Sequence, residues 1–379
     1  MLPVSAWRAG PAAPAAPTLD GMARSHLTLA ALATSAVPDL DIAGTRSYSY
    51  DLHGDFDSAL LTSRDGTEFI IRVPASQDAE TEQGADLVAL RALTAGVRAR
   101  MPFDVPEYVG QTPVGGTRAV LYTFLPGDKV ALENVQPGDG LAASIGRAIA
   151  AIHSLPTSFV TDAGMPTLST AECLAATKSL IASATATGLV PAALAKRWKE
   201  AVDDEDLWRF QPAVINGALT IDSFIVREES VVGLIGWSAL RVGDPARDLH
   251  WVLGMKADAA ESALEAYSLA RGSASDPNLL FRATLYAELE LARWLIHGRE
   301  LHDQLIVDDA VAMLDSLVER VHDDDLDPLA PNTGPIMAVT EVEALLDASP
   351  RESGDDASLG LPPVDDEREP SDDEFERDD

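Results

Sequence analysis

The residues whose types could do chemistry lie in one loop, between the two apolar runs of VINGALTIDSFIV (residues 214–226). Asp222 is the only carboxylate of this loop, and Ser223 beside it carries a hydroxyl. A carboxylate can accept a proton or bind a metal ion, whereas a hydroxyl is a weak ligand for a hard metal ion. The pattern predicts a strand, a tight turn and a second strand, with little chemistry at the turn. The other unusual residues of the loop are Asn216, Gly217 and Ala218.

A second polar stretch follows in VGLIGWSALRVGDPARDLHW (residues 232–251). An apolar strand ends at Gly236-Trp237, Gly243-Asp244-Pro245 forms a turn, and a helix after the turn carries Asp248. Taken alone, Gly-Asp-Pro is typical of an ordinary turn. Histidines among apolar helical neighbours and tryptophans in apolar stretches are expected to be packed in the core rather than to bind ligands. The residues concerned are His153, His250, Trp237 and Trp251.

The elements that must position these residues fall into two groups. Strand and turn signals dominate residues 46–126, where SALLTSRDGTEFIIRVP predicts a hairpin that turns at Arg64-Asp65-Gly66. A helix with Leu87, Leu90 and Leu93 on one face follows, and AVLYTF predicts another buried strand. A small β-rich lobe followed by a larger helical lobe is an α+β fold, with a cleft expected between the lobes. Helices are predicted over residues 141–155, 168–186, 190–209, 257–271, 276–300 and 304–321, interrupted by short strands within 213–236.

The chain is predicted to have four segments: a disordered Pro/Ala-rich extension (1–21), the N-lobe (22–127), the helical C-lobe (128–325) and a C-terminal segment (326–379). Translation could begin at Met1 or at Met22. The stretch MARSHLTLAALATSAV is similar to a signal peptide, but nothing later in the chain is built for export. We expect instead an amphipathic helix that begins near Ser25 and turns four side chains toward a core: Leu27, Leu29, Leu32 and Val37.

The C-terminal segment is predicted to contain one short helix. Thr340 and Glu343 have the spacing of a capping box, which predicts a helix over residues 338–348 on a flexible Pro-rich linker. Residues 351–379 carry 13 acidic and 3 basic side chains and few large apolar ones, so we expect a disordered acidic tail.

Composition restricts the partners of this chain. The formal net charge is −33, which disfavours nucleic acid and anionic membranes, because both attract Lys and Arg. Cations or basic proteins are compatible with this charge, and solubility alone also explains it. The single cysteine, Cys173, excludes a disulfide framework or a cysteine metal site and suits the cytoplasm.

In combination, the two polar stretches resemble the catalytic segment of the aminoglycoside and macrolide phosphotransferases, which have a protein-kinase-like fold. That family's pattern is roughly H-G-D-x-x-x-x-N-x-L-V, then a hairpin, I-D-W, and G-D-P-A-x-D-L. The register runs without a gap through Gly217, Leu219, Ile225, Val226, Ile235, Trp237, Gly243, Asp244, Pro245, Ala246, Asp248 and Leu249. The resemblance implies a two-lobed fold in which Gly217, Trp237, Asp244 and Asp248 support the loop.

The first lobe carries the resemblance further. EFIIRVP resembles the strand whose basic residue, here Arg72, reaches the phosphates of a nucleotide, and Asp86 falls where the family has the glutamate that pairs with it. YTFLPG resembles the segment that links the lobes and meets adenine, which implies nucleotide-binding positions at Tyr122 and Phe124.

The departures from the pattern concern the reactive residues. The family's catalytic His, Asp and Asn are replaced by Asn216, Ala218 and Ser223, and its magnesium-binding Asp by Gly236. Phosphoryl transfer needs an Asp beside the attacking hydroxyl and magnesium ions held by the other two positions. A positioned general base contributes about 10²–10⁴ in rate, and a metal clamp several kcal/mol more. The sequence therefore predicts a pseudokinase that binds a small molecule or a protein.

Two other interpretations stay open. The chain could be an active phosphotransferase for an aminoglycoside, macrolide or sugar-like hydroxyl, with Asp222 or another carboxylate substituted in. Only then are ATP or GTP and magnesium expected. It could also be chiefly a binder of basic proteins through its acidic surface.

Overall fold

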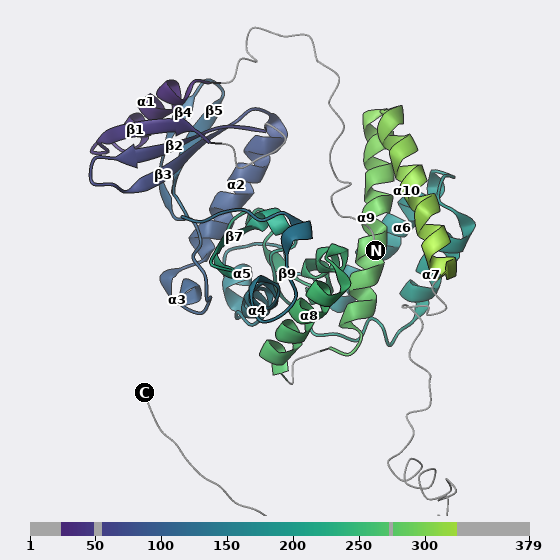
Figure 1. Cartoon of the computed structure of the whole chain (residues 1–379). Coiled ribbons are helices and arrows are strands. Elements are labelled where there is room, and N and C mark those ends of the chain that lie inside the picture. Colours follow the sequence, from purple (N-terminus) through teal and green to yellow (C-terminus); the bar gives the residue numbers. More distant parts are fainter. Residues whose placement is uncertain (1–23, 49–54, 273–275, 324–379) are drawn as a thin grey trace, which may run out of the picture. The chain divides into compact units, whose positions relative to one another are not determined.

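The computed structural model describes residues 24–48, 55–272 and 276–323 (Figure 1). The extension over residues 1–21, the helix expected over 338–348 and the acidic tail all lie outside the described residues.

Five antiparallel strands form the sheet of the N-lobe, in the order β1-β2-β3-β5-β4 (Figure 1). The predicted turn at Arg64-Asp65-Gly66 joins β2 and β3, whose register pairs Ser58 with Arg72. The edge strand β4 pairs with β5, which places the strand that leads to the C-lobe between β3 and β4. The strands are β1 (Ile42–Ser47), β2 (Phe56–Ser63), β3 (Glu68–Pro74), β4 (Tyr108–Val114) and β5 (Thr117–Thr123).

The helix α1 (His26–Ala36) packs on one face of this sheet. The Ser25 hydroxyl caps it by accepting the N–H of Thr28, so the predicted start is correct. Leu29 and Ala33 are buried against strand residues of β2, β3 and β5. The prediction for Leu27 was wrong, since its side chain is 66% exposed. A helix on a flat sheet buries a narrow stripe, and Leu27 lies outside that stripe.

The helix α2 (Gln77–Ala92) packs on the opposite face. Ser76 caps it, and Leu87 and Leu90 join the main core together with Val120 and Tyr122 of β5. Alternate residues of the same strand, such as Leu121, face the α1 side, as the two-residue period of a strand requires. The short helix α3 (Ala95–Arg98) follows.

The C-lobe is mainly helical, as predicted. One prediction was too long: α7 ends at Asp203 rather than at residue 209. The Asp204 side chain accepts the N–H groups of Asp206 and Leu207, and this local turn replaces another helical turn. None of the described helices is long and apolar enough to span a membrane. The helices are η2 (Leu132–Asn134), α4 (Leu141–His153), α5 (Ser158–Asp162), α6 (Thr170–Ala186), α7 (Ala192–Asp203), α8 (Ala257–Arg271), α9 (Leu279–Leu301) and α10 (Gln304–Asp323).

Two short ladders interrupt these helices, and the two strands of VINGALTIDSFIV belong to different ladders. The strands on either side of the loop, β6 (Ala213–Ile215) and β7 (Phe224–Arg227), do not pair with each other. Instead β6 pairs with β9 (Arg241–Gly243), and β7 pairs with β8 (Ser230–Leu234). The loop between β6 and β7 is therefore a connection between two ladders rather than a hairpin turn.

Backbone contacts and one continuous core join the two lobes. The N–H of Asp104 donates to the carbonyl of Val232, and the carbonyl of Asp104 accepts the N–H of Leu234. The main core also runs from α2 and β5 into the helices of the C-lobe.

Candidate functional site: a catalytic-type loop without acidic residues at its centre

The loop of residues 216–223 begins where β6 ends and closes with the 3₁₀ helix η3 (Ile221–Ser223). The pairing of β6 with β9 brings the next 3₁₀ helix, η4 (Pro245–Asp248), beneath the start of the loop. The carboxylate of Asp248 is thereby placed under Asn216 and Gly217, although 31 residues separate Gly217 from Asp248 along the chain.

Asp248 is fully buried and holds the loop through its backbone. One carboxylate oxygen accepts the N–H of Asn216 at 2.7 Å, and the other accepts the N–H of Gly217 at 2.7 Å. The Nε2 of His153 lies 3.2 Å from the first of these oxygens, and its Nδ1 lies 2.9 Å from the hydroxyl of Tyr267. Because the carboxylate can only accept, His153 donates to it from Nε2. Burial raises the pKa of Tyr267, which keeps that hydroxyl protonated.

The side chain of Asn216 connects the loop to Gly236. Its Nδ2 donates to the Gly236 carbonyl at 2.8 Å, and its Oδ1 accepts the N–H of Ala218 at 3.2 Å. Gly236 has a φ of +75°, a region that residues other than glycine enter at a cost, asparagine and aspartate least. The amide therefore ties together the two segments that, in the resemblance, would carry the catalytic Asp and the metal-binding Asp.

Of three other loop residues, Ala218 and Ser223 offer no carboxylate or amide, and Asp222 points to solvent. Ala218 exposes only its methyl group. Ser223 is buried, and its hydroxyl accepts the N–H of Thr220, which closes a capping box on η3. Asp222 is exposed, and among the described residues its carboxylate makes no hydrogen bond or ion pair.

These donor groups do not fit magnesium. Magnesium prefers carboxylates in near-octahedral geometry. Here the Ser223 hydroxyl and the Gly236 carbonyl are both used by internal hydrogen bonds, and Ala218 has no side-chain oxygen. Within the described ranges, no three His, Cys, Asp or Glu side chains lie close enough together to hold a metal ion.

The N-lobe places Asp86 against the same segment. Its Oδ1 accepts the N–H of Trp237 at 2.8 Å. Burial raises the pKa of Asp86, while the Trp237 hydrogen bond and the nearby charge of Arg72 act in the opposite direction. The Arg72 guanidinium carbon lies 3.8 Å from the centre of the Phe56 ring. Arg72 and Asp86 thus lie within electrostatic reach of each other.

The two aromatic positions at the end of β5 differ in their surroundings. Tyr122 is buried, and its hydroxyl has no hydrogen-bond partner within the part of the chain that the structure describes. Burial together with the Asp86 charge raises the pKa of Tyr122. Phe124 is half-buried and meets Tyr48 edge-on, with 5.8 Å between the ring centres. Tyr122 is therefore close enough to Asp86 and Arg72 to feel their charges. Phe124 instead packs against Tyr48, the residue that follows β1.

Three arginines lie together beside the loop. Arg241 donates to the Gly217 carbonyl at 3.2 Å, and both Arg247 and Arg293 contact the same oxygen of Glu290, at 3.6 and 3.1 Å. Desolvation, and next the charge of Arg247, lower the pKa of both Arg241 and Arg293. This side of the loop is cationic although the chain as a whole is strongly acidic.

Asp244 anchors the segment to α9. Its carboxylate accepts two hydrogen bonds from the buried Arg282, at 2.7 and 3.0 Å, and one from the Tyr286 hydroxyl. The Arg282 guanidinium also contacts Asp276 and stacks on Phe210. This network fixes the turn that leads to Asp248.

Some of these residues were not connected by sequence reasoning. His153 and His250 were interpreted as packed polar residues; His153 contacts Asp248, and Nδ1 of His250 donates to the Arg247 carbonyl. Burial lowers the pKa of His250. Arg241 and Arg282 were not singled out, because a lone arginine in a strand or helix has no local pattern that marks its partner.

A sequence model of the phosphotransferase enzyme family matches residues 52–285, more than half of the chain. The chain belongs to this family. Solved structures agree on the fold. The apoenzyme of macrolide 2'-phosphotransferase MphH from Brachybacterium faecium is 22% identical with a TM-score of 0.63, covering 75% of this chain and 96% of that one. The GDP complex of aminoglycoside 2'-phosphotransferase-IIIa is 18% identical with a TM-score of 0.61, covering 77% and 98%.

A curated relative, the uncharacterised protein YcbJ of Bacillus subtilis (strain 168), is 23% identical over 207 residues, which are 51% of this chain. The chain spans 65% of the length of that relative. The two-lobed, protein-kinase-like fold expected from the sequence is thus confirmed: a β-sheet N-lobe and a helical C-lobe.

Proposed function

We propose that this member of the phosphotransferase family is a pseudokinase, which acts by binding a small molecule or a protein partner rather than by transferring phosphate. The observation that carries the proposal is the Asn216 side chain, whose amide bonds to both Gly236 and Ala218. A neutral hydrogen-bonded bridge lies where a phosphotransferase would need a base and a metal-binding carboxylate.

The arginines beside the loop also bear on the acceptor. Aminoglycosides are polycations, and a site for them would be expected to present carboxylates. Arg241, Arg247 and Arg293 present three positive charges, against the carboxylate of Glu290 and that of the buried Asp248, which is bonded to the loop backbone. This arrangement supports a neutral or anionic ligand over an aminoglycoside.

A thermal-shift series tests the proposal. A ligand that binds only the folded state raises the free energy of unfolding by RT ln(1 + [L]/Kd). We expect magnesium to add nothing to any rise in melting temperature that ATP or GTP produces in the natural chain.

The matched variant carries Ala218→Asp, Ser223→Asn and Gly236→Asp. A Cβ at Gly236 meets nothing within 4 Å, and Asp is among the residues that best tolerate its positive φ. We expect this variant to gain a magnesium-dependent shift. An equal magnesium-dependent shift in the natural chain would contradict the proposal.

One observation favours the alternative of an active phosphotransferase. The Asp222 carboxylate is exposed and, among the described residues, is not engaged in any hydrogen bond, so it is chemically available within the loop. On this alternative, Asp222→Ala removes all transfer activity, whereas Asp222→Asn preserves the fold and separates charge from shape. Measurable transfer by the natural chain that Asp222→Ala abolishes would favour the alternative over the pseudokinase.

A further inference from the structure

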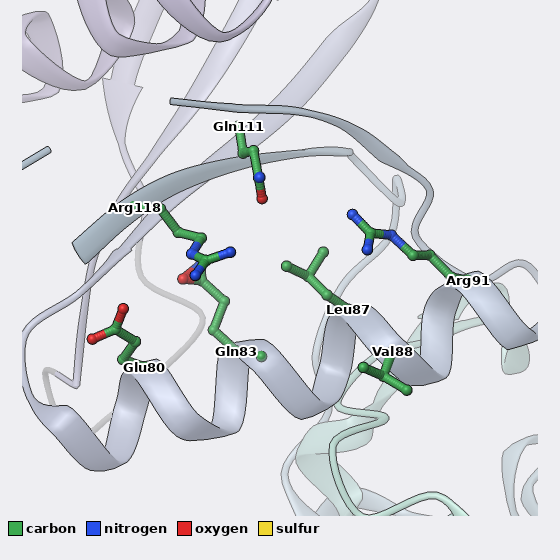
Figure 2. Close-up of a pocket in the computed structure, with 8 residues that line it drawn as sticks. Glu80, Gln83, Leu87, Val88, Arg91, Gln111 and Arg118 are labelled. Carbon is green, nitrogen blue, oxygen red and sulfur yellow. The ribbon is translucent and has the colours of Figure 1, made fainter. Parts of the chain in front are cut away.

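A small pocket lies between α2 and the β4–β5 hairpin, and it shares no lining residue with the loop of residues 216–223 (Figure 2). Its volume is about 240 Å³, slightly below the roughly 300–1,000 Å³ of most ligand sites. A ligand for this pocket is therefore small. The pocket is lined by Glu80, Gln83, Gly84, Leu87, Val88, Arg91, Gln111 and Arg118.

Gln83 is the feature that points to a ligand. Its side chain is buried, with the residue 2% exposed, and Figure 2 shows it rising from α2 toward the strand that carries Arg118. Its Nε2 donates to the backbone carbonyl of Arg72 at 3.4 Å, but its Oε1 has no hydrogen-bond partner among the described residues. A buried acceptor without a donor is unfavourable, and a ligand with an O–H or N–H group would satisfy it.

The charges around the pocket indicate what else the ligand carries. Arg91 extends from α2 and Arg118 from β5, and Figure 2 shows both guanidinium groups on the pocket side of their elements. Arg118 is exposed and, among the described residues, makes no ion pair; Arg91 lies over the ring of Tyr108. Among the described residues, Glu80 is the only carboxylate that lines the pocket. The lining therefore carries a net positive charge, although the net charge of the chain is −33. Guanidinium groups bind carboxylate and phosphate oxygens well.

From this geometry we infer that the pocket is a binding site for a small oxyanion, a carboxylate or a phosphate, that also carries a hydrogen-bond donor. The anion contacts Arg118 and Arg91, and its donor bonds to Oε1 of Gln83. The buried side chain of Leu87 and the half-exposed Val88 offer only a narrow apolar surface, which suits a short hydroxy acid or phosphate.

Isothermal titration calorimetry on the full chain tests the inference with three probes: malate, succinate and inorganic phosphate, at constant ionic strength. Malate and succinate have the same chain length and charge, but only malate has the hydroxyl. We expect a dissociation constant of about 1 mM or tighter for malate or phosphate, and weaker binding of succinate. Binding of malate alone identifies a carboxylate ligand, and binding of phosphate alone a phosphoryl ligand; either result supports the inference.

Three variants make the test specific. Arg118→Gln should weaken binding by about tenfold, because it removes a charge-assisted hydrogen bond. Arg209→Gln, an exposed arginine of the C-lobe whose described ion pairs are local, is the matched control and should change nothing.

Gln83→Met should abolish the preference for malate over succinate. If this variant folds poorly, comparing malate with succinate on the natural chain still tests whether the ligand's hydroxyl contributes to binding. Equal weakening by Arg118→Gln and Arg209→Gln, or no binding of any probe at about 10 mM, would overturn the inference.

Discussion

Asp248 receives hydrogen bonds from two consecutive backbone N–H groups of the loop, and His153 adds a third. Without this buried carboxylate, the N–H groups that donate to it would be left without an acceptor, and each buried, unpaired donor is costly. These hydrogen bonds fix the backbone at the start of the loop.

Substituting Asp248→Ala is predicted to destabilise the chain by about 3–5 kcal/mol, the usual penalty for removing one partner of a buried charged network. Urea unfolding followed by circular dichroism measures this. Asp222→Ala is the control, since it removes an exposed carboxylate from the same loop and should stay within about 0.5 kcal/mol. Equal effects of the two substitutions would show that Asp248 does not hold the loop.

Asp86 gives a pH dependence with a defined sign. Burial raises its pKa above the ordinary 3.8, so the folded state holds the proton more tightly than the unfolded state does. This contribution to stability is fully present below the unfolded pKa and is lost as the pH rises through the folded pKa.

Asp86→Asn removes this titration while keeping a side-chain oxygen that can accept the Trp237 N–H. We predict that the natural chain loses stability relative to this variant as the pH rises from acid toward neutral. Denaturant titrations of both proteins over that range measure the difference. A difference in the opposite direction would mean that Arg72 and Trp237 outweigh the desolvation of the carboxylate.

At the scale of elements, local patterns predicted most helices and the β2–β3 hairpin, because periodicity and turn residues are local signals. The partner of β6 was missed: β9 has only three residues, Arg241–Gly243, and no apolar run that marks it as a strand. The same limit applies to the Asn216–Gly236 bridge, which joins residues 20 apart in sequence. Sequence reasoning found the altered positions but not the bonds that fill them, because those bonds depend on tertiary structure.

The close approach of α4 to α8 at Gly146 supplies a stability prediction. A Cβ at Gly146 of α4 would lie 2.0 Å from the carbonyl oxygen of Ala263 on α8, a separation that only movement of one backbone can relieve. Gly146→Ala should therefore lower the melting temperature by several degrees. Gly84→Ala on α2 meets nothing within 4 Å and should instead stabilise by about 0.5–1 kcal/mol. Differential scanning fluorimetry of both variants decides the point, and a neutral Gly146→Ala would count against the close packing of α4 on α8.

At the scale of the whole molecule, the segment boundaries stay predictions, as does a cytoplasmic location. Residues 351–379 hold a charge of −10, from 13 acidic and 3 basic side chains, and only Leu359, Leu361, Val364 and Phe375 as large apolar residues. From the sequence we therefore expect this segment to bury too little apolar surface to offset the entropy of ordering.

Deleting residues 326–379 is therefore predicted to leave the two lobes folded and their melting temperature within a few degrees of the full chain. Gel filtration and thermal unfolding of the truncated protein test this. Aggregation or loss of the cooperative transition would place part of the deleted segment in the core and move the boundary.

The central claim is that the loop of residues 216–223 keeps its geometry but no longer supports phosphoryl transfer. The most direct test is the rate of phosphate release or transfer by purified protein, with ATP and with GTP, in the presence of magnesium and a macrolide or aminoglycoside acceptor. We predict no turnover above the uncatalysed background and no change on chelation. Turnover in the ordinary kinase range of about 1–100 per second, abolished by chelation, would contradict the account.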